Sequence, residues 1–451
     1  MALQTNAKKL EAGPPGILGK PEMLMIAVGQ VVGAGVISLI GVGIGQTGKS
    51  IWLSYLIAIV VGFFIAVPFM MLGSTLRLSG GPYSAIHTLL GERVAGMFLV
   101  GQIPGLVSMA VYCVSVGNYM KSMFPEFNVR IVGVITLTIF YIIHLCGVDI
   151  MAKVQKYMGY ILLLSLMLFI IFGMRKVDFS VMDFSSQDFM THGWNGVFTA
   201  VFLLVFSTHG YYYAIGYGKD AKNARRDIPW AMMCAVPIIL VLYVGASIVA
   251  AGVLPVQEVA DQPLTNVAKA VLPSSLFLVF IVGGAMMALL TSLNSSIGFS
   301  ANMLLAGAED GWLPESWAKT NKRGAPYVIL TLIYLIGLIP VIINFDVGKI
   351  TNNILLFTST LMFITFYAIF KLPSVCPEEW KNSRMHMAGW KFYLLMGLGT
   401  LMEVAVFIYS IRGVGVTVAV VSLAALVLSI TYSQIRFKKG CVHSVVSVWS
   451  D

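Results

Sequence analysis

The chain has 451 residues, of which 58% are hydrophobic and only 11% are charged, whereas a soluble globular chain carries about 25% charged residues. Together with a mean hydropathy of +0.86, this composition excludes a soluble enzyme. It also excludes a transmembrane β-barrel, because barrel strands alternate apolar and polar side chains over about ten residues, whereas this chain stays apolar over runs of about twenty. We therefore expect an all-α polytopic membrane protein.

Twelve apolar runs are long enough to cross about 30 Å of hydrocarbon. They predict a single transmembrane domain over 23–435, between a polar tail at 1–22 and a second tail at 436–451. The first run is too long for a signal-peptide core, so we expect it to remain as a membrane helix. The expected spans are 23–46, 51–76, 94–120, 129–148, 154–173, 194–217, 229–253, 275–306, 325–344, 351–372, 390–411 and 414–435.

Lysine and arginine are distributed unequally between the two sides of these spans. The segments on the side of both tails hold 21 of the 29 basic residues, and the other side holds 8. The positive-inside rule then predicts cytoplasmic termini in the cell membrane. The net charge of +9 is thus a topology signal, and we expect no nucleic-acid partner. Segments outside the membrane are too short for a soluble domain, which places the function inside the helix bundle.

The cysteines predict neither disulfides nor a metal, and we expect no cofactor. All five stand alone, without a CxxC pair or a histidine and cysteine cluster of zinc-ligand spacing: Cys113, Cys146, Cys234, Cys376 and Cys441.

The first span has glycine at its centre, at Gly29, Gly33 and Gly35. Glycine relaxes a helix and lets a ligand approach the backbone. The alternative is close helix packing through the small-xxx-small pattern of Gly29 and Gly33.

The sixth span carries His209 and Gly210 near mid-membrane, followed by three tyrosines. An ionisable group at this depth is a functional hypothesis by default. The alternative is a neutral imidazole that is hydrogen-bonded to a neighbouring helix.

Interrupted helices at corresponding positions of two halves predict an inverted-repeat transporter. Freed amides at the half-helix N-termini can bind a substrate carboxylate, and freed carbonyls can bind a cation. We expect repeat one at about 23–173, repeat two at about 194–372, and two peripheral helices at about 390–435.

Other polar residues within the spans favour a pocket, although each hydroxyl could equally bond to its own helix. The eighth span carries Thr291, Ser292, Asn294, Ser295 and Ser296. Glu403 is the one charged residue that we place well inside a span. Because it lies outside the predicted repeat, we favour helix packing or a dimer contact over a proton relay for it.

Several motifs occur in order along the chain: Gly33–Ile37 (GAGVI), Ser79–Tyr83 (SGGPY), Leu90–Ala95 (LGERVA), Cys146–Gln155, Lys222–Pro229 and Ala308–Pro314. Together they resemble motifs of the amino acid, polyamine and organocation (APC) superfamily of secondary transporters, over essentially the whole chain. The resemblance implies the ten-helix inverted-repeat fold first known from the bacterial leucine transporter, plus two peripheral helices.

By the same resemblance, the substrate carboxylate is held by Gly33, Ala34 and Gly35 in helix 1. The amino-group side is lined by Thr208, His209 and Gly210, and Phe206 is the aromatic gate. Helix 3 presents Ile103, Pro104, Ser108 and Val111 to the substrate, and helix 8 presents Ser292, Ser295 and Ser296.

The sequence departs from the family pattern at three informative positions. Tyr212 replaces an acidic residue that many relatives carry after the helix 6 glycine. Leu162 stands where proton-coupled or sodium-independent relatives place a lysine in helix 5, and Ser296 replaces an aromatic residue of some amine exchangers. These departures count against proton coupling through a lysine in helix 5. They also count against membership of the subgroup of amine exchangers.

The sequence thus predicts secondary active transport of an amino acid or related amine by alternating access, as a symporter or an exchanger. An antiporter linked to a decarboxylation pathway is the alternative, and a channel, a membrane-embedded enzyme or a nontransporting receptor fits less well. Coupling to H⁺, with His209 as the proton site, and coupling to Na⁺ through helix 8 hydroxyls both stay open. The absence of predicted charge in the pocket favours a neutral substrate, and the protein is expected to be a monomer or a homodimer in the bilayer.

Overall fold

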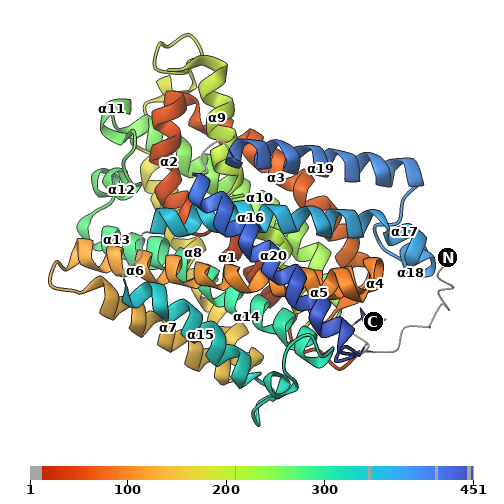
Figure 1. Ribbon diagram of the computed structural model, residues 1–451. Helices are drawn as coiled ribbons and strands as arrows, with labels where there is room; N and C mark the ends of the chain where they lie inside the picture. Colours follow the sequence, from red (N-terminus) through yellow and green to blue (C-terminus); the bar gives the residue numbers. More distant parts are fainter. Residues whose placement is uncertain (1–12, 209, 344–346, 412–414, 444–447, 450–451) are drawn as a thin grey trace.

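The computed structural model describes residues 13–208, 210–343, 347–411, 415–443 and 448–449 (Figure 1). The side chains of Ala34, 347–358 and 417–418 lie outside this description. Within it, eight helical segments are long and apolar enough to cross a membrane, and three shorter apolar helices accompany them. Helices satisfy all their backbone hydrogen bonds internally, which the hydrocarbon core requires. The all-α polytopic fold is therefore confirmed.

The helices of the first half begin with α1 (Lys20–Val31), α2 (Ala34–Thr47) and α3 (Ile51–Thr75). They continue with α4 (Pro82–Leu90), α5 (Glu92–Gln102), the 3₁₀ helix η2 (Ile103–Ser108), α6 (Met109–Met123), α7 (Val129–Leu145) and α8 (Val148–Met174). Short 3₁₀ turns η1 (Gly48–Ser50) and η3 (Phe179–Met182) lie in the connections.

The second half begins with α9 (Gly193–Val205), the 3₁₀ helix η4 (Gly210–Tyr217) and α10 (Ala224–Val253). Then follow α11 (Val256–Val259), α12 (Thr265–Val271), α13 (Ser274–Val279), the π-helix η5 (Phe280–Met286), α14 (Met287–Glu309), η6 (Glu315–Ala318), α15 (Tyr327–Ile342) and α16 (Val347–Phe370). The chain closes with α17 (Leu372–Val375), α18 (Pro377–Lys381), α19 (Gly389–Ile411) and α20 (Val416–Lys438).

The structure divides four of the predicted spans, and one of them, the run at 194–217, becomes α9 and η4. The run at 23–46 is two helices, as its glycines predicted. The run at 94–120 is α5, η2 and α6, because Pro104 lacks the N–H that an uninterrupted helix needs. The run at 275–306 contains the π-helix η5. The split between the fourth and fifth spans lies at Gly147, whose φ of +100° suits glycine.

Packing separates a central group of helices from a lipid-facing rim. α1 packs against α8, α10 and α14, and α3 packs against α9 and α10. α7 and α15 lie side by side at the periphery, while α19 packs on α3 and α16 (Figure 1). The rim exposes large apolar residues, such as Ile131 and Ile135 on α7 and Leu428 on α20. Such a surface is stable in lipid and not in water.

Both described ends of the chain contact the same group of loops. β1 (Arg77–Leu78) pairs antiparallel with β2 (Val448–Trp449), and Leu18 bridges to Ala221. The buried Arg77 guanidinium donates to the carbonyls of Pro14 at 2.6 Å and Gly218 at 3.0 Å. The two described ends therefore lie on one side of the bundle, opposite α11 and α12 (Figure 1). The side of the membrane stays a prediction.

Candidate functional site

Helix 1 is interrupted where the glycines predicted. α1 ends at Val31 and α2 begins at Ala34, with Gly33 in an extended conformation (φ −103°, ψ −152°) as its N-cap. No side chain caps α2. Since the first N–H groups of a helix have no acceptor within the helix, the amides of Ala34 and Gly35 are available to a ligand, whereas the Gly33 amide donates to the Val31 carbonyl at 2.8 Å. The helix dipole makes this end favourable for an anion.

Helix 6 is interrupted at the corresponding place. α9 ends at Val205 and η4 begins at Gly210, while His209 lies outside the described residues. Thr208 is fully buried, and its hydroxyl donates to the Ala58 carbonyl at 3.1 Å and the Val205 carbonyl at 3.0 Å. The predicted gate residue Phe206 is 45% exposed.

The two interruptions lie against each other. A Cβ atom built on Gly35 would stand 2.3 Å from the Ser207 Cβ, closer than any real Cβ contact. A Cβ atom on Gly210 would stand 3.1 Å from the Gln30 carbonyl oxygen. The glycines at both breaks are therefore needed for close backbone approach, and small-residue packing and helix interruption occur together here.

One buried hydroxyl bridges the two breaks. Tyr243 of α10 places its Oη 2.8 Å from the Val31 carbonyl and 2.9 Å from the Ser207 carbonyl. A phenol has one proton and can donate fully to only one of them at a time. Tyr243 therefore links the end of α1 to the break in helix 6. The sequence analysis missed it, since an isolated tyrosine in an apolar run carries no signal.

Helix 8 (α14) packs against α1 next to the break in helix 1. Ser292 Oγ donates to the Gly29 carbonyl at 3.0 Å, and Thr291 Oγ1 donates to the same atom at 3.1 Å. Ser295 Oγ donates to Gln30 Oε1, and Ser296 Oγ lies 3.3 Å from that atom. The structure thus brings the three predicted serines of helix 8 to helix 1.

The predicted helix 3 residues are divided between two environments. Ile103, Pro104 and Ser108 lie in η2, which packs against α15 and α16. Val111 lies in α6, which packs against α14. The polar residue that helix 3 brings to the site is Tyr112, which lies close to Ser296 and Gln30. Neither Tyr112 nor Gln30 was predicted, because single polar residues in apolar runs are common.

Tyr212 faces away from the helix 1 break. Its ring stacks on Phe69 of α3, with centroids 5.0 Å apart. The adjacent Tyr213 ring is 5.0 Å away, and the phenol of Tyr213 lies close to Ser296. The tyrosine pair therefore reaches from the site toward α3.

A second polar network, separate from this site, joins α1 (helix 1), α7 (helix 4), α8 (helix 5) and α14 (helix 8). Asn294 Nδ2 donates to Gln155 Oε1 at 2.8 Å, and Gln155 Nε2 donates to the Met25 carbonyl at 3.1 Å. His144 Nε2 lies 3.1 Å from the Asn294 carbonyl. Leu162, at the position of the family lysine, is fully buried. Neutral amides therefore tie α8 to α1 and α14.

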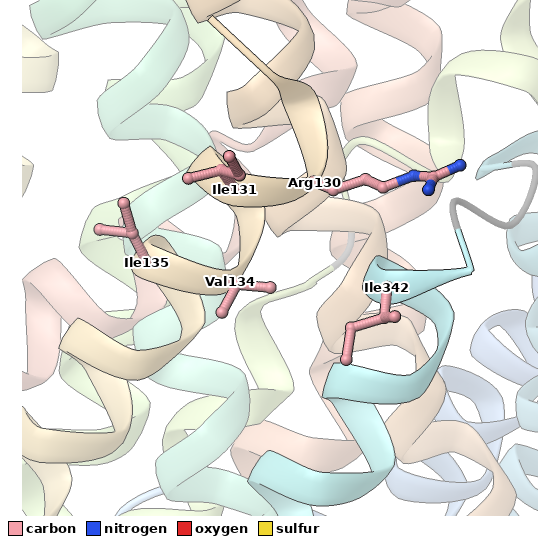
Figure 2. A pocket seen from close by; sticks show the side chains of 5 residues that line it. All are labelled: Arg130, Ile131, Val134, Ile135 and Ile342. Carbon is pink, nitrogen blue, oxygen red and sulfur yellow. The ribbon is translucent and has the colours of Figure 1, made fainter.

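A separate groove lies on the rim and is not this site. It has a volume of about 280 Å³, and Figure 2 shows it between α7 and α15, lined by Arg130, Ile131, Val134, Ile135 and Ile342. Three of these isoleucines are more than half exposed. No residue of the predicted site lines it.

Comparison with known proteins places this geometry in a family. Residues 18–431 match the family described as amino acid permease. The branched-chain amino acid permease BcaP of Bacillus subtilis is 26% identical over 339 residues, which cover 69% of this chain and 71% of the relative. The probable threonine/serine transporter YbxG of Bacillus subtilis is 25% identical over 393 residues, covering 82% and 79%. The methylthioribose transporter of Bacillus subtilis is 22% identical over 320 residues, covering 66% and 68%.

The family match extends across nearly the whole membrane domain and agrees with the motifs found in the sequence. It indicates a multi-pass transporter of the cell membrane rather than an enzyme, with a small-molecule substrate of the amino acid class. The chain belongs to the amino acid permease family of the APC superfamily.

Proposed function

We propose that the chain is a secondary active transporter that carries a neutral amino acid or related amine by alternating access. The observation that supports this best is the meeting of two interrupted helices at mid-bundle, bridged by the Tyr243 hydroxyl. Broken helices supply unpaired backbone groups without unpaired side-chain charge. A zwitterionic substrate needs such groups at both ends.

In this proposal the substrate carboxylate binds at Gly33, Ala34 and Gly35: the amides of Ala34 and Gly35 donate to it, and the Gly33 amide joins them when it leaves the Val31 carbonyl. The amino group lies toward the carbonyls of the helix 6 break, where Ser207 and Thr208 are. Helix 8 closes the pocket with hydroxyl groups that can hydrogen-bond either end. Because no Asp, Glu, Lys or Arg occurs among these residues, the site suits an uncharged side chain.

The helix contacts support the inverted repeat. Under a relation that exchanges helices 1–5 with helices 6–10, the pair α1 and α10 becomes the pair α9 and α3. Both pairs are packed together in the structure. The pair α3 and α10, which the relation maps onto itself, is also packed. Such symmetry is the basis on which one repeat rocks against the other.

A thermal-shift screen of the purified protein tests the substrate class. A ligand that binds only the folded state raises apparent stability. The panel contains leucine, isoleucine, valine, threonine and serine, with the amine and the methyl ester of each. We expect an amino acid to stabilise and its ester to fail, because the ester removes the anion that α2 binds. Stabilisation by methylthioribose, with none by any amino acid or amine, would contradict the proposal.

A further inference from the structure

Glu403 of α19 is a buried acid that the site described above does not use. It is 2% exposed within the single chain, so it does not lie on the surface that a second copy could contact. Among the described residues it has no hydrogen-bond or ion-pair partner. A carboxylate in that position would be costly, whereas a protonated carboxyl is much less so.

The described parts of the helices packed on α19 bring no cation close to Glu403. α19 packs against α3, α9 and α16. The sequences of α3 and α9 contain no Asp, Glu, His, Lys or Arg, and Tyr55 is their one titratable side chain. α16 contributes Tyr367, which is 57% exposed. Its Lys349 belongs to a backbone position about 25 Å along the helix from Phe366, the α16 residue that lies next to Gly399.

The backbone next to Glu403 offers an acceptor for a protonated carboxyl. Pro68 lies inside α3 and has no N–H, so the Phe64 carbonyl lacks its usual helical donor. That carbonyl oxygen faces Gly399, where an added Cβ would stand 2.6 Å away. Gly399 is one helical turn before Glu403, and side chains on a helix tilt toward its N-terminus. The acid and the freed carbonyl therefore lie in one region.

A chain of polar side chains runs from Glu403 to the substrate site. The Tyr212 phenol is close enough to Glu403 for an electrostatic interaction. Tyr212 neighbours Tyr213, which lies close to Ser296, and Ser296 reaches Gln30. Both tyrosines belong to η4, the mobile half of an interrupted helix in the proposed mechanism.

We propose that Glu403 is the proton-binding site that couples an inward proton gradient to transport, with Tyr212 transmitting its protonation state to helix 6. This rests on the proposed function. Glu403 takes up a proton from the outer side with the substrate and releases it to the cytoplasm as η4 moves. The hydroxyls of Thr291 and Ser292 both lie within hydrogen-bond distance of the Gly29 carbonyl, so the lone pairs of that carbonyl accept protons and are not free to coordinate a sodium ion.

The first test is infrared difference spectroscopy of the purified protein between acid and alkaline pH. We expect the C=O stretch of a protonated carboxylic acid in the wild type. The band should be lost in Glu403→Gln and kept in Glu378→Gln, a matched variant of an exposed acid in α18. Absence of the band in the wild type at every pH overturns the proposal, whatever the protein transports.

The second test is uptake of labelled leucine and threonine into proteoliposomes with the membrane potential clamped at zero. One coupled proton and a gradient of one pH unit allow about tenfold accumulation. The wild type and Glu378→Gln should accumulate the amino acid toward this limit, with sodium or choline outside. Glu403→Gln should equilibrate without accumulation yet still exchange labelled for unlabelled substrate.

The outcomes separate the two proposals. Equal accumulation by Glu403→Gln and the wild type overturns the coupling role and leaves amino acid transport intact. A wild type that carries the infrared band but neither takes up nor exchanges any amino acid of the panel overturns the proposed function, and the coupling role with it. Accumulation that requires sodium also overturns the role of Glu403.

Discussion

Gly35 lies where helix 1 passes the break in helix 6. The Cβ of an alanine here would stand 2.3 Å from the Ser207 Cβ, so Gly35→Ala must push helix 1 and helix 6 apart. We expect uptake of the transported amino acid to fall by at least about tenfold, since a displacement of this size misaligns the groups that hold the substrate.

The matched control for this substitution is Gly397→Ala on α19, where an added Cβ meets nothing within 4 Å. Alanine also favours helix over glycine by about 1 kcal/mol, so this variant should transport normally and be slightly more stable. Wild-type uptake by Gly35→Ala would show that the close approach of the breaks is dispensable.

Tyr243 and Tyr55 offer a second matched pair. Their rings pack edge to face with centroids 5.2 Å apart, yet only the Tyr243 hydroxyl has hydrogen-bond acceptors among the described residues. Tyr243→Phe removes the one proton that the Val31 and Ser207 carbonyls share, and because the Val31 carbonyl still accepts from the Gly33 amide, the Ser207 carbonyl loses its donor at a cost of about 1–3 kcal/mol. We expect a lower melting temperature and slower transport.

Tyr55→Phe removes a buried hydroxyl that lies near Ser207 but makes no hydrogen bond of full geometry with the described residues, so the stability of this variant should be unchanged or higher. Thermal unfolding of both variants in the same detergent checks the comparison. Equal losses in the two variants would mean that ring packing, and not the bridge between the breaks, stabilises this region.

Among the elements of the bundle, the amides of Gln155 and Asn294 hold helices 1, 5 and 8 together. Gln155→Leu and Asn294→Leu should each destabilise by about 1–3 kcal/mol, because each strands a buried polar partner. The double variant should lose less free energy of unfolding than the two single variants together, with an interaction energy of about 0.5–3 kcal/mol. Additive losses in a double-mutant cycle would show that the two amides act independently.

The elements that could be predicted from the sequence are those with a strong local cause. Glycine clusters predicted the interruptions near Gly33 and Gly210, and long apolar runs predicted the spans. The 3₁₀ helix at Ile103–Ser108 was missed, since a proline alone often only kinks a membrane helix. Tyr243, Gln30 and Tyr112 were missed for another reason: their roles depend on which helices pack together, and no spacing in one helix encodes that.

For the molecule as a whole, the side of the membrane on which the termini lie is predicted by the sequence and not by the bundle geometry. The structure brings both described ends to one side, and the excess of basic residues predicts that this side is cytoplasmic. The burial that accompanies this meeting raises the pKa of the Asp220 carboxyl, although Asn302 donates to it at 2.8 Å.

Cysteine labelling in intact cells tests the orientation. Lys222→Cys and Lys269→Cys both place a thiol at an exposed position, on opposite sides of the bundle. We expect an impermeant maleimide added outside to label the cysteine at 269 and to reach the one at 222 only after lysis. The reverse pattern would place the termini outside.

The central claim is that the meeting of two broken helices forms a transport site for an amino acid. Counterflow in proteoliposomes tests it most directly, because liposomes loaded with unlabelled leucine or threonine accumulate the labelled form only if one site is exposed to each side in turn. We expect transient accumulation by the wild type and its loss in Gly35→Ala. Binding of an amino acid without any counterflow by the wild type would contradict it.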